Sequence, residues 1–130
     1  MKLVTESVQD ILKSKSKVEI DSAIQKKFQN SEPNEILGYA LSRGNLYLVK
    51  YALSKRADPA YMDNWLIKWA AENGYIELVK QLLADFRVDP SDSNNAAILW
   101  AAYHEHVEIV NLLLTDSRVL KKLTAKDKNN

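Results

Sequence analysis

Apolar residues recur along most of this chain at the three- and four-residue spacing of amphipathic helices. The clearest case is the segment 76–84, whose apolar side chains share one side of a helical wheel. The segment 64–73 precedes it and ends at Gly74, and glycine readily adopts the left-handed conformation that closes a helix. The polar stretch DFRVDPSDSNN follows as a loop. The pattern predicts two short antiparallel helices joined by a tight turn, with Asn64 as the N-cap of the first.

This helix pair is repeated. Residues 64–88 align with residues 95–119 at a shift of 31, and residues 34–53 align with residues 64–83 at a shift of 30. The residues that recur include Asn64, Trp69, Ala70, Ala71, Leu82, Leu83, Asp85 and Arg87, which return as Asn95, Trp100, Ala101, Ala102, Leu113, Leu114, Asp116 and Arg118. Stacked helix pairs of this kind are the building units of a helical solenoid.

The flanking segments differ from the repeat. Before the first clear unit, two apolar stripes predict two helices of a cap; they consist of Val8, Ile11 and Leu12, and of Val18, Ile20, Ala23, Ile24 and Phe28. The predicted organisation is a single domain with a capping unit at 1–33, repeats at 34–63 and 64–94, a third repeat with a C-terminal cap at 95–123, and a disordered tail at 124–130. The start at methionine and the polar end suggest a complete chain.

The stretch AAENGYIELVKQLLADFRVDP resembles the ankyrin repeat, which has an Ala-Ala pair, a glycine turn and an apolar second helix. The resemblance covers residues 34–119. It implies an all-α, ankyrin-like helical solenoid of three helix-pair repeats with an N-terminal helical cap. Divergent arrays with a period this short resemble those common in amoebae and in their large DNA viruses. Trp65 stands in WLIK, where the family has its Thr-Pro-Leu-His start, and Glu105 replaces the turn glycine at an expected cost of about 1 kcal/mol.

Composition narrows the function. The 130 residues include 18 basic and 17 acidic side chains, a net charge of +1, and no cysteine. This balance gives no reason to expect nucleic acid or an anionic membrane as a partner, and the lack of cysteine excludes disulfides and thiolate metal sites. No apolar run reaches signal-peptide or membrane-spanning length. We expect an intracellular, cytoplasmic protein, which could act in a host cell.

Two histidines form the sole cluster that resembles a metal site. His104 and His106 are two residues apart, whereas a helical zinc site uses histidines four apart, and both lie at a predicted turn. We therefore expect surface or structural histidines, no metal and no cofactor. The sequence also lacks a nucleophile–base pattern and a phosphate-binding glycine loop, so we expect no enzyme.

The aromatic residues Tyr39, Trp69 and Trp100 occupy one position in three successive units. They can pack between the repeats, or they can line the concave groove with which ankyrin-like proteins grip partners. Trp65 has no aromatic counterpart in the other units. The pair Tyr61–Met62 is apolar in an otherwise polar loop, which indicates either contact with a partner or a ring folded onto its own helix.

The resemblance places partner contacts on the finger loops and on the solvent side of the first helix of each unit. The candidates are Ser42, Arg43, Tyr61, Met62, Asn64, Trp65, Trp69, Glu72, Asn73, Asp92, Ser93, Tyr103 and His104. The predicted function is non-enzymatic protein–protein recognition by a monomer. The alternative is a structural, self-assembling protein that stacks through its solenoid ends, where Leu112 replaces the Gln81 of the middle unit. A third hypothesis is an enzyme or metal-binding protein that uses His104 and His106.

Overall fold

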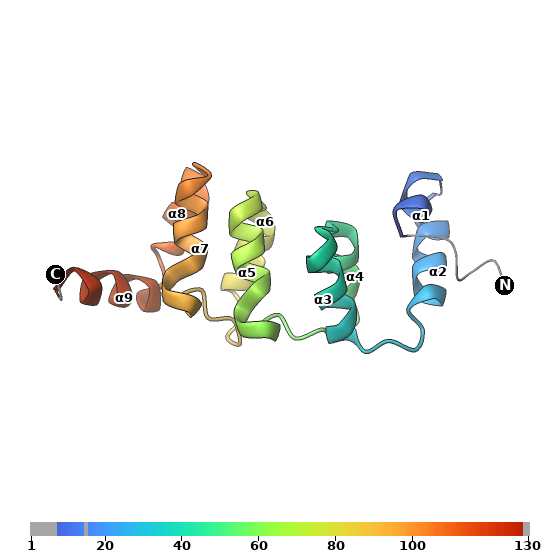
Figure 1. Ribbon diagram of the computed structural model, residues 1–130, viewed down its shortest axis with the longest axis horizontal. Helices are drawn as coiled ribbons and strands as arrows, with labels where there is room; N and C mark the ends of the chain where they lie inside the picture. The colour runs from blue at the N-terminus through green and yellow to red at the C-terminus, as the bar shows by residue number, and fades with distance from the viewer. Residues whose placement is uncertain (1–7, 15, 129–130) are drawn as a thin grey trace.

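The computed structural model describes residues 8–14 and 16–128, which form nine helices and no strand (Figure 1). The helices are α1 (Val8–Ser14), α2 (Lys17–Lys27), α3 (Pro33–Arg43), α4 (Leu46–Ser54), α5 (Tyr61–Asn73), α6 (Ile76–Leu83), α7 (Asp92–Tyr103), α8 (Val107–Leu113) and α9 (Ser117–Lys128). In this part of the chain no helix has both the length and the apolar character needed to cross a membrane.

The helices stand as four pairs along one axis, and α9 lies at the end of the row (Figure 1). The pairs α3–α4, α5–α6 and α7–α8 coincide with the three predicted repeats, and α1–α2 lies where the sequence predicts the capping unit. Long loops join successive pairs along one edge of the stack, and tight turns join the two helices of each pair at the opposite edge. The predicted all-α solenoid is confirmed.

The tight turns follow the sequence pattern. Gly44 and Gly74 close α3 and α5 with φ of 63° and 76°, in the left-handed region that glycine adopts without a steric cost. Their amides donate to carbonyls of the preceding helical turn, which satisfies the end of each helix. Glu105 also adopts positive φ, at 60°, so the third turn keeps the left-handed conformation despite its side chain.

The core of the stack combines small residues of the first helices with aliphatic residues of both helices. Ala40, Ala70 and Ala101 hold one repeated position and are fully buried, which lets neighbouring helices approach closely. The second helices contribute fully buried aliphatic side chains, for example Val49 and Val79. Each unit therefore buries its apolar side against the next unit, as the repeat predicts.

The capping unit is tied to the first repeat. Ser16 and Glu19 form a capping box at the start of α2, and Ile24 of that helix is fully buried. The Tyr47 hydroxyl of α4 donates a hydrogen bond to Asp21 of α2, and this bond, with burial and the Asp21 charge, raises the pKa of Tyr47 to about 12. Val18 is 75% exposed, so its predicted place in the apolar stripe of α2 is wrong.

The C-terminal segment differs from the prediction. One short turn was expected near residue 119 and disorder from residue 124, but α9 forms a 12-residue helix that reaches Lys128. Val119 is fully buried at its start and holds it against the third unit. The last two residues, 129–130, lie outside the described part of the chain.

Candidate binding surface

The first helices are fastened to the loops of the stack by a repeated asparagine. The Oδ1 atom of Asn34 accepts a hydrogen bond from the Asp58 amide at 2.7 Å, and Oδ1 of Asn64 accepts one from the Asp89 amide at 2.8 Å. The predicted N-cap role of Asn64 is wrong, because no side chain caps the start of α5. Its amide instead reaches the loop that leads to the next unit, which fixes the spacing of successive loops.

Asn95 is the equivalent residue of the third unit, but it makes different hydrogen bonds. Its Nδ2 donates to the Val119 carbonyl at 3.1 Å, and its Oδ1 is buried without a hydrogen-bond partner. At a shift of 31 the amide expected to reach it is that of Leu120, which donates to the Asp116 carbonyl as α9 begins. In the other units this loop amide donates a hydrogen bond to the asparagine side chain. In the third unit the same amide lies in the first turn of α9 and donates to the Asp116 carbonyl instead, so Asn95 does not receive it.

The side chain of Asn64 also contacts the next unit of the stack. Its Nδ2 donates to Oδ2 of Asp92 at 2.8 Å, and this hydrogen bond is the main reason why the pKa of Asp92 is lowered. Nearby, the Lys68 ammonium donates to Oγ of Ser93 at 2.7 Å. Asn64 is buried, so its amide serves the junction between the second and third units rather than the surface.

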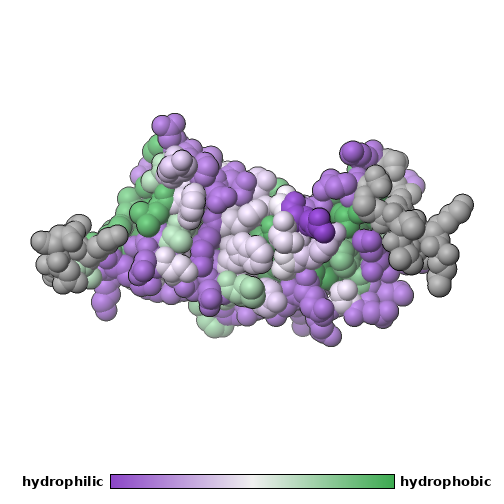
Figure 2. All heavy atoms as spheres, in the orientation of Figure 1, coloured by the Kyte–Doolittle hydropathy of each residue, from purple (hydrophilic) through white to green (hydrophobic). Residues whose placement is uncertain are grey.

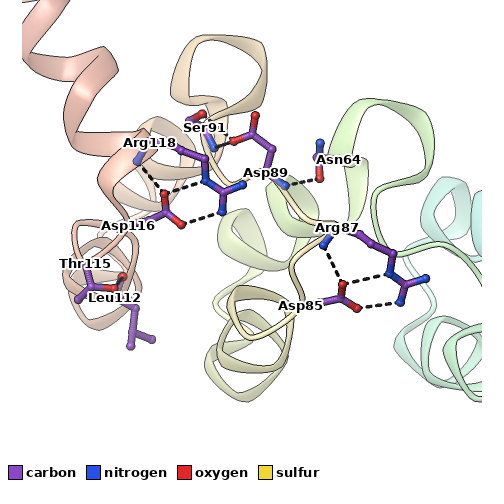
Figure 3. Close-up of polar contacts among 9 residues, drawn as sticks. All are labelled: Asn64, Asp85, Arg87, Asp89, Ser91, Leu112, Thr115, Asp116 and Arg118. Carbon is purple, nitrogen blue, oxygen red and sulfur yellow. Dashed lines mark hydrogen bonds and ion pairs between the residues drawn. The ribbon is translucent and has the colours of Figure 1, made fainter.

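Two Asp-x-Arg turns stiffen the loops after α6 and α8 (Figure 3). Asp85 accepts hydrogen bonds from the backbone amide and the guanidinium of Arg87, and Asp116 does the same with Arg118. These bonds lower the pKa of both aspartates and raise that of both arginines. In the same loop Asp89 accepts from the amide and hydroxyl of Ser91. The loops are thus held by their own side chains.

The loop edge carries two left-handed segments, at residues 62–64 and 93–95, with φ between 56° and 64°. Asparagine, aspartate and serine adopt this conformation more readily than most residues, whereas Met62 has no such preference. The first unit has Pro33 here, whose ring fixes φ near −65° and excludes it. The segments leave Met62, Asp63, Ser93 and Asn94 exposed at the loop edge.

Tyr61 and Met62 are adjacent in the chain but differ in how much of each side chain is exposed. Tyr61 is half-buried, and a Cβ built on Gly38 of α3 would lie 3.4 Å from its ring. The ring therefore packs on the preceding unit, not on its own helix as one prediction had it. Met62 is 58% exposed. Trp65, one helical turn further on, is half-buried and packs against the core.

The other candidate contact residues lie at the turn edge of the same helices. Ser42 and Arg43 end α3, Glu72 and Asn73 end α5, and Tyr103 and His104 end α7. All except the half-buried Glu72 are exposed. Several side chains are held against their helix: the Ser42 hydroxyl donates to the Tyr39 carbonyl, the Arg43 guanidinium lies 5.2 Å from the Tyr39 ring, and Asn73 donates to the Trp69 carbonyl. The candidates thus form two rows, one at each end of the first helices.

The aromatic column lies between these two rows. Tyr39 is 36% exposed, Trp69 is half-buried and Trp100 is 46% exposed. Each ring contacts a ring other than its counterparts in the column: Tyr39 with Phe28, Trp69 with Tyr75, and Trp100 with Tyr103. Of these three contacts, only the one between Tyr39 and Phe28 joins two units, and a role of the column in binding a partner stays a prediction.

His104 and His106 lie at the α7–α8 turn. On a helix, a spacing of two residues would point their side chains apart, but at this turn their rings stack with centroids 6.1 Å apart. Nε2 of His106 donates to the Glu72 carbonyl at 3.0 Å, which joins the third unit to the second. In the described part of the chain no three His, Cys, Asp or Glu side chains are grouped to hold a metal ion.

Sequence reasoning missed three exposed apolar side chains. Phe86 is 92% exposed beside the Asp85–Arg87 turn, Leu99 is 52% exposed on α7, and Val107 is 66% exposed at the start of α8. Leu99 could have been found from the alignment, because the middle unit has Lys68 there. Phe86 is the extra residue that makes the loop after α6 longer than the loop after α4, and the alignment shows this difference.

The second helices also leave a groove on the other side of the stack. It has a volume of about 540 Å³ and is lined by Leu46 and Lys50 of α4, Tyr75 and residues 76–78 and 81 of the second unit, and Glu108 of α8. Its rim carries charges of both signs, and none of the candidate contact residues lies in it.

Comparison with known protein families identifies the repeat. A family model of ankyrin repeats, in three copies, matches residues 37–127. No curated protein and no solved structure matched the chain. The matched range spans α4 to α8 in full and most of α3 and α9.

Proposed function

Because this chain belongs to the ankyrin repeat family, whose repeats generally serve as protein–protein interaction modules, we propose that it is a non-enzymatic recognition module. It binds a partner protein through the exposed side of its first helices and the finger loops that join the units. The fold by itself does not fix the function, so the proposal depends on the side chains displayed there.

The observation that carries the proposal is the display of aromatic and apolar side chains on a loop edge that is rigidly held. Met62 is 58% exposed, and it lies three residues before Trp65 in a loop edge anchored by the Asn64 hydrogen bonds. Exposed apolar side chains on an ordered surface bind at low entropic cost, because little conformational freedom remains to be lost. Trp65 adds an aromatic anchor of the kind enriched at interface hot spots.

The two rows of polar candidates frame this anchor. Asp92 and Ser93 lie at the loop edge and Asn73 at the turn edge, and such polar rims surround the apolar centre of most interfaces. The first helix of the middle unit rises about 12 Å from Trp65 to Asn73, so a partner segment of a few residues can reach both rows. This arrangement favours an extended peptide or a loop of a folded protein as the bound segment.

Cellular location is part of the proposal. The chain has no cysteine that an oxidising compartment would pair, which supports an intracellular, cytoplasmic setting. Fractionation of cells that express the protein with a small tag would test it, and recovery mainly in the medium would contradict it.

The binding experiment is an affinity pull-down with mass spectrometry, followed by calorimetric titration of the partner that is found. Met62→Lys should weaken binding by about tenfold or more, which corresponds to about 1.4 kcal/mol. Val18→Lys is the matched control, since it makes the same kind of exchange at an exposed residue of the cap. Equal affinity of the wild type and Met62→Lys, with both variants folded, would refute the proposed surface.

A further inference from the structure

The outer side of the last helix pair presents an apolar surface. We call it the end face and define it by Leu99, Tyr103 and Val107. At a shift of 31 these residues match Lys68, Glu72 and Ile76, and the middle unit makes its contacts with the third unit there. The Lys68 ammonium donates to Ser93, and the Glu72 carbonyl accepts from His106. The end face therefore points to where a fourth unit would stand.

Two residues of the end face, Leu99 and Tyr103, are more apolar than those that the middle unit has at the same positions, and the third is apolar in both units. Leu99 replaces a lysine and is 52% exposed, Tyr103 replaces a glutamate and is 77% exposed, and Val107 is 66% exposed. Terminal repeats normally show the opposite trend, because their outer side faces water. Apolar side chains gather at this end of the stack, above α9 (Figure 2). The replacement of charged residues by exposed apolar ones indicates a surface that another molecule covers.

A unit that stacked as the third unit stacks on the middle one does not fit this surface. A Cβ built on Gly74 would lie 2.8 Å from the His106 ring of the next unit, so the turn position must be glycine where the next unit places a ring there, whereas a Cβ built on Gly44 meets nothing within 4 Å. The equivalent residue on the end face is Glu105, which carries a full side chain at φ of 60°. Glu105 therefore blocks the stacking geometry that joins the middle and third units.

The helix α9 leaves the end face open. It is anchored at its start, where Val119 is buried and accepts a hydrogen bond from Asn95, and where the Lys122 ammonium donates to the Ser91 carbonyl. From there it extends away from the stack instead of folding up along α7 (Figure 1). Leu120 on this helix is 43% exposed. Two apolar surfaces thus lie at the same end of the chain, and neither covers the other.

We propose that the end face is the interface of a two-fold symmetric dimer, in which α9 of each copy lies across the end face of the other. Two-fold symmetry lets each copy cover the apolar surface of its partner at the same time. The lengths allow this arrangement, because α9 has 12 residues, about 18 Å of helix, and the right-handed part of α7 that follows residue 95 is shorter. Opposite charges support this arrangement as well, since Lys121 is exposed on α9 and Glu105 is exposed beside the end face.

The area buried in the interface determines how tightly the dimer is expected to form. Large apolar side chains bury about 150–250 Å² each, so the exposed parts of those on the end face and of Trp100 give roughly 400–500 Å² per copy. The dimer would bury on the order of 1,000 Å², at the low end of specific interfaces. This predicts a weak, reversible dimer that forms at micromolar concentration or above. It does not depend on the recognition surface around Met62.

Analytical ultracentrifugation tests the dimer. The wild-type protein, examined from roughly 5 to 500 µM, should pass from monomer to dimer and form no larger species, because a two-fold contact closes. The double variant Leu99→Lys/Tyr103→Glu restores the residue types of the middle unit and should raise the dissociation constant at least about tenfold. Leu120→Lys should raise it as well, because it alters the second apolar surface, and circular dichroism should show an unchanged fold in both variants.

Val18→Lys is again the matched control, since it changes an exposed apolar residue at the other end of the stack. A monomer at every concentration would overturn the dimer, and so would equal association of the wild type and the double variant. Open-ended assembly would overturn the two-fold symmetry. Dimerisation lost in the double variant but kept in Leu120→Lys would overturn the exchange of α9.

Discussion

Replacing Gly74 by alanine tests whether the tight turns hold the units together. Gly74 has φ of 76°, and its added Cβ would lie 2.8 Å from Cε1, 3.0 Å from Nδ1 and 3.2 Å from Nε2 of His106. Left-handed backbone costs about 1–2 kcal/mol for a residue with a Cβ. Moving the ring breaks its hydrogen bond to Glu72, worth about 0.5–1.5 kcal/mol, and repacking adds about 1–3 kcal/mol. Together these costs predict that Gly74→Ala destabilises the protein by about 2.5–6.5 kcal/mol.

Gly44→Ala is the matched control. Gly44 has φ of 63°, but a Cβ there meets nothing within 4 Å, so its substitution should cost only the backbone term of about 1–2 kcal/mol. Urea unfolding followed by tryptophan fluorescence gives both values. His106→Ala in the Gly74→Ala background removes the obstructing ring, so the double variant should be more stable than the sum of the single costs predicts. Equal costs at the two glycines, or strict additivity in the double variant, would refute this reasoning.

Three further predictions follow from the turns and the loop network. Glu105→Gly should stabilise the protein by about 1 kcal/mol, because it removes left-handed strain, and an unchanged urea midpoint would contradict this. Asn64→Ala should cost about 1–3 kcal/mol, because it leaves the part-buried Asp89 amide unpaired, while the surface change Asn73→Ala should stay within about 0.5 kcal/mol. The lowered pKa of Asp116 stabilises the fold above the unfolded pKa of about 3.9, and this contribution is lost as the pH falls through the folded value. Thermal midpoints should therefore drop from about pH 5 to pH 3, and Asp116→Asn should flatten that dependence; parallel curves would count against it.

The sequence alone determined the repeat and therefore the architecture. Helical spacing in residues 76–84 and the recurrence of whole segments at shifts of 30 and 31 predicted paired helices in a stack, and the structure has them. Gly44 and Gly74 marked the turns, because few other residues adopt positive φ without strain. These features are local or periodic, so a single chain displays them without any knowledge of long-range contacts.

The candidate surface was only partly predictable. The rows at the loop and turn edges follow from the repeat, but exposure depends on neighbouring units. Tyr61 packs on Gly38 and is half-buried, whereas the adjacent Met62 is exposed, and nothing in the local sequence separates the two. The alignment shows that Leu99 stands where the middle unit has Lys68. This exchange indicates an exposed apolar surface only once the structure shows that no described unit stacks on the third one.

Tertiary structure decided where polar side chains find their partners. An asparagine at the start of a helix can cap it or reach another segment, and Asn64 does the latter because the next loop passes within 2.8 Å. The polar C-terminal residues were expected to be disordered, yet α9 forms where Val119 can be buried against the third unit. Periodicity fixes which residues face inward within a unit. Only the stacked structure determines which unit, loop or solvent each remaining side chain meets, because those contacts join residues that are distant in the chain.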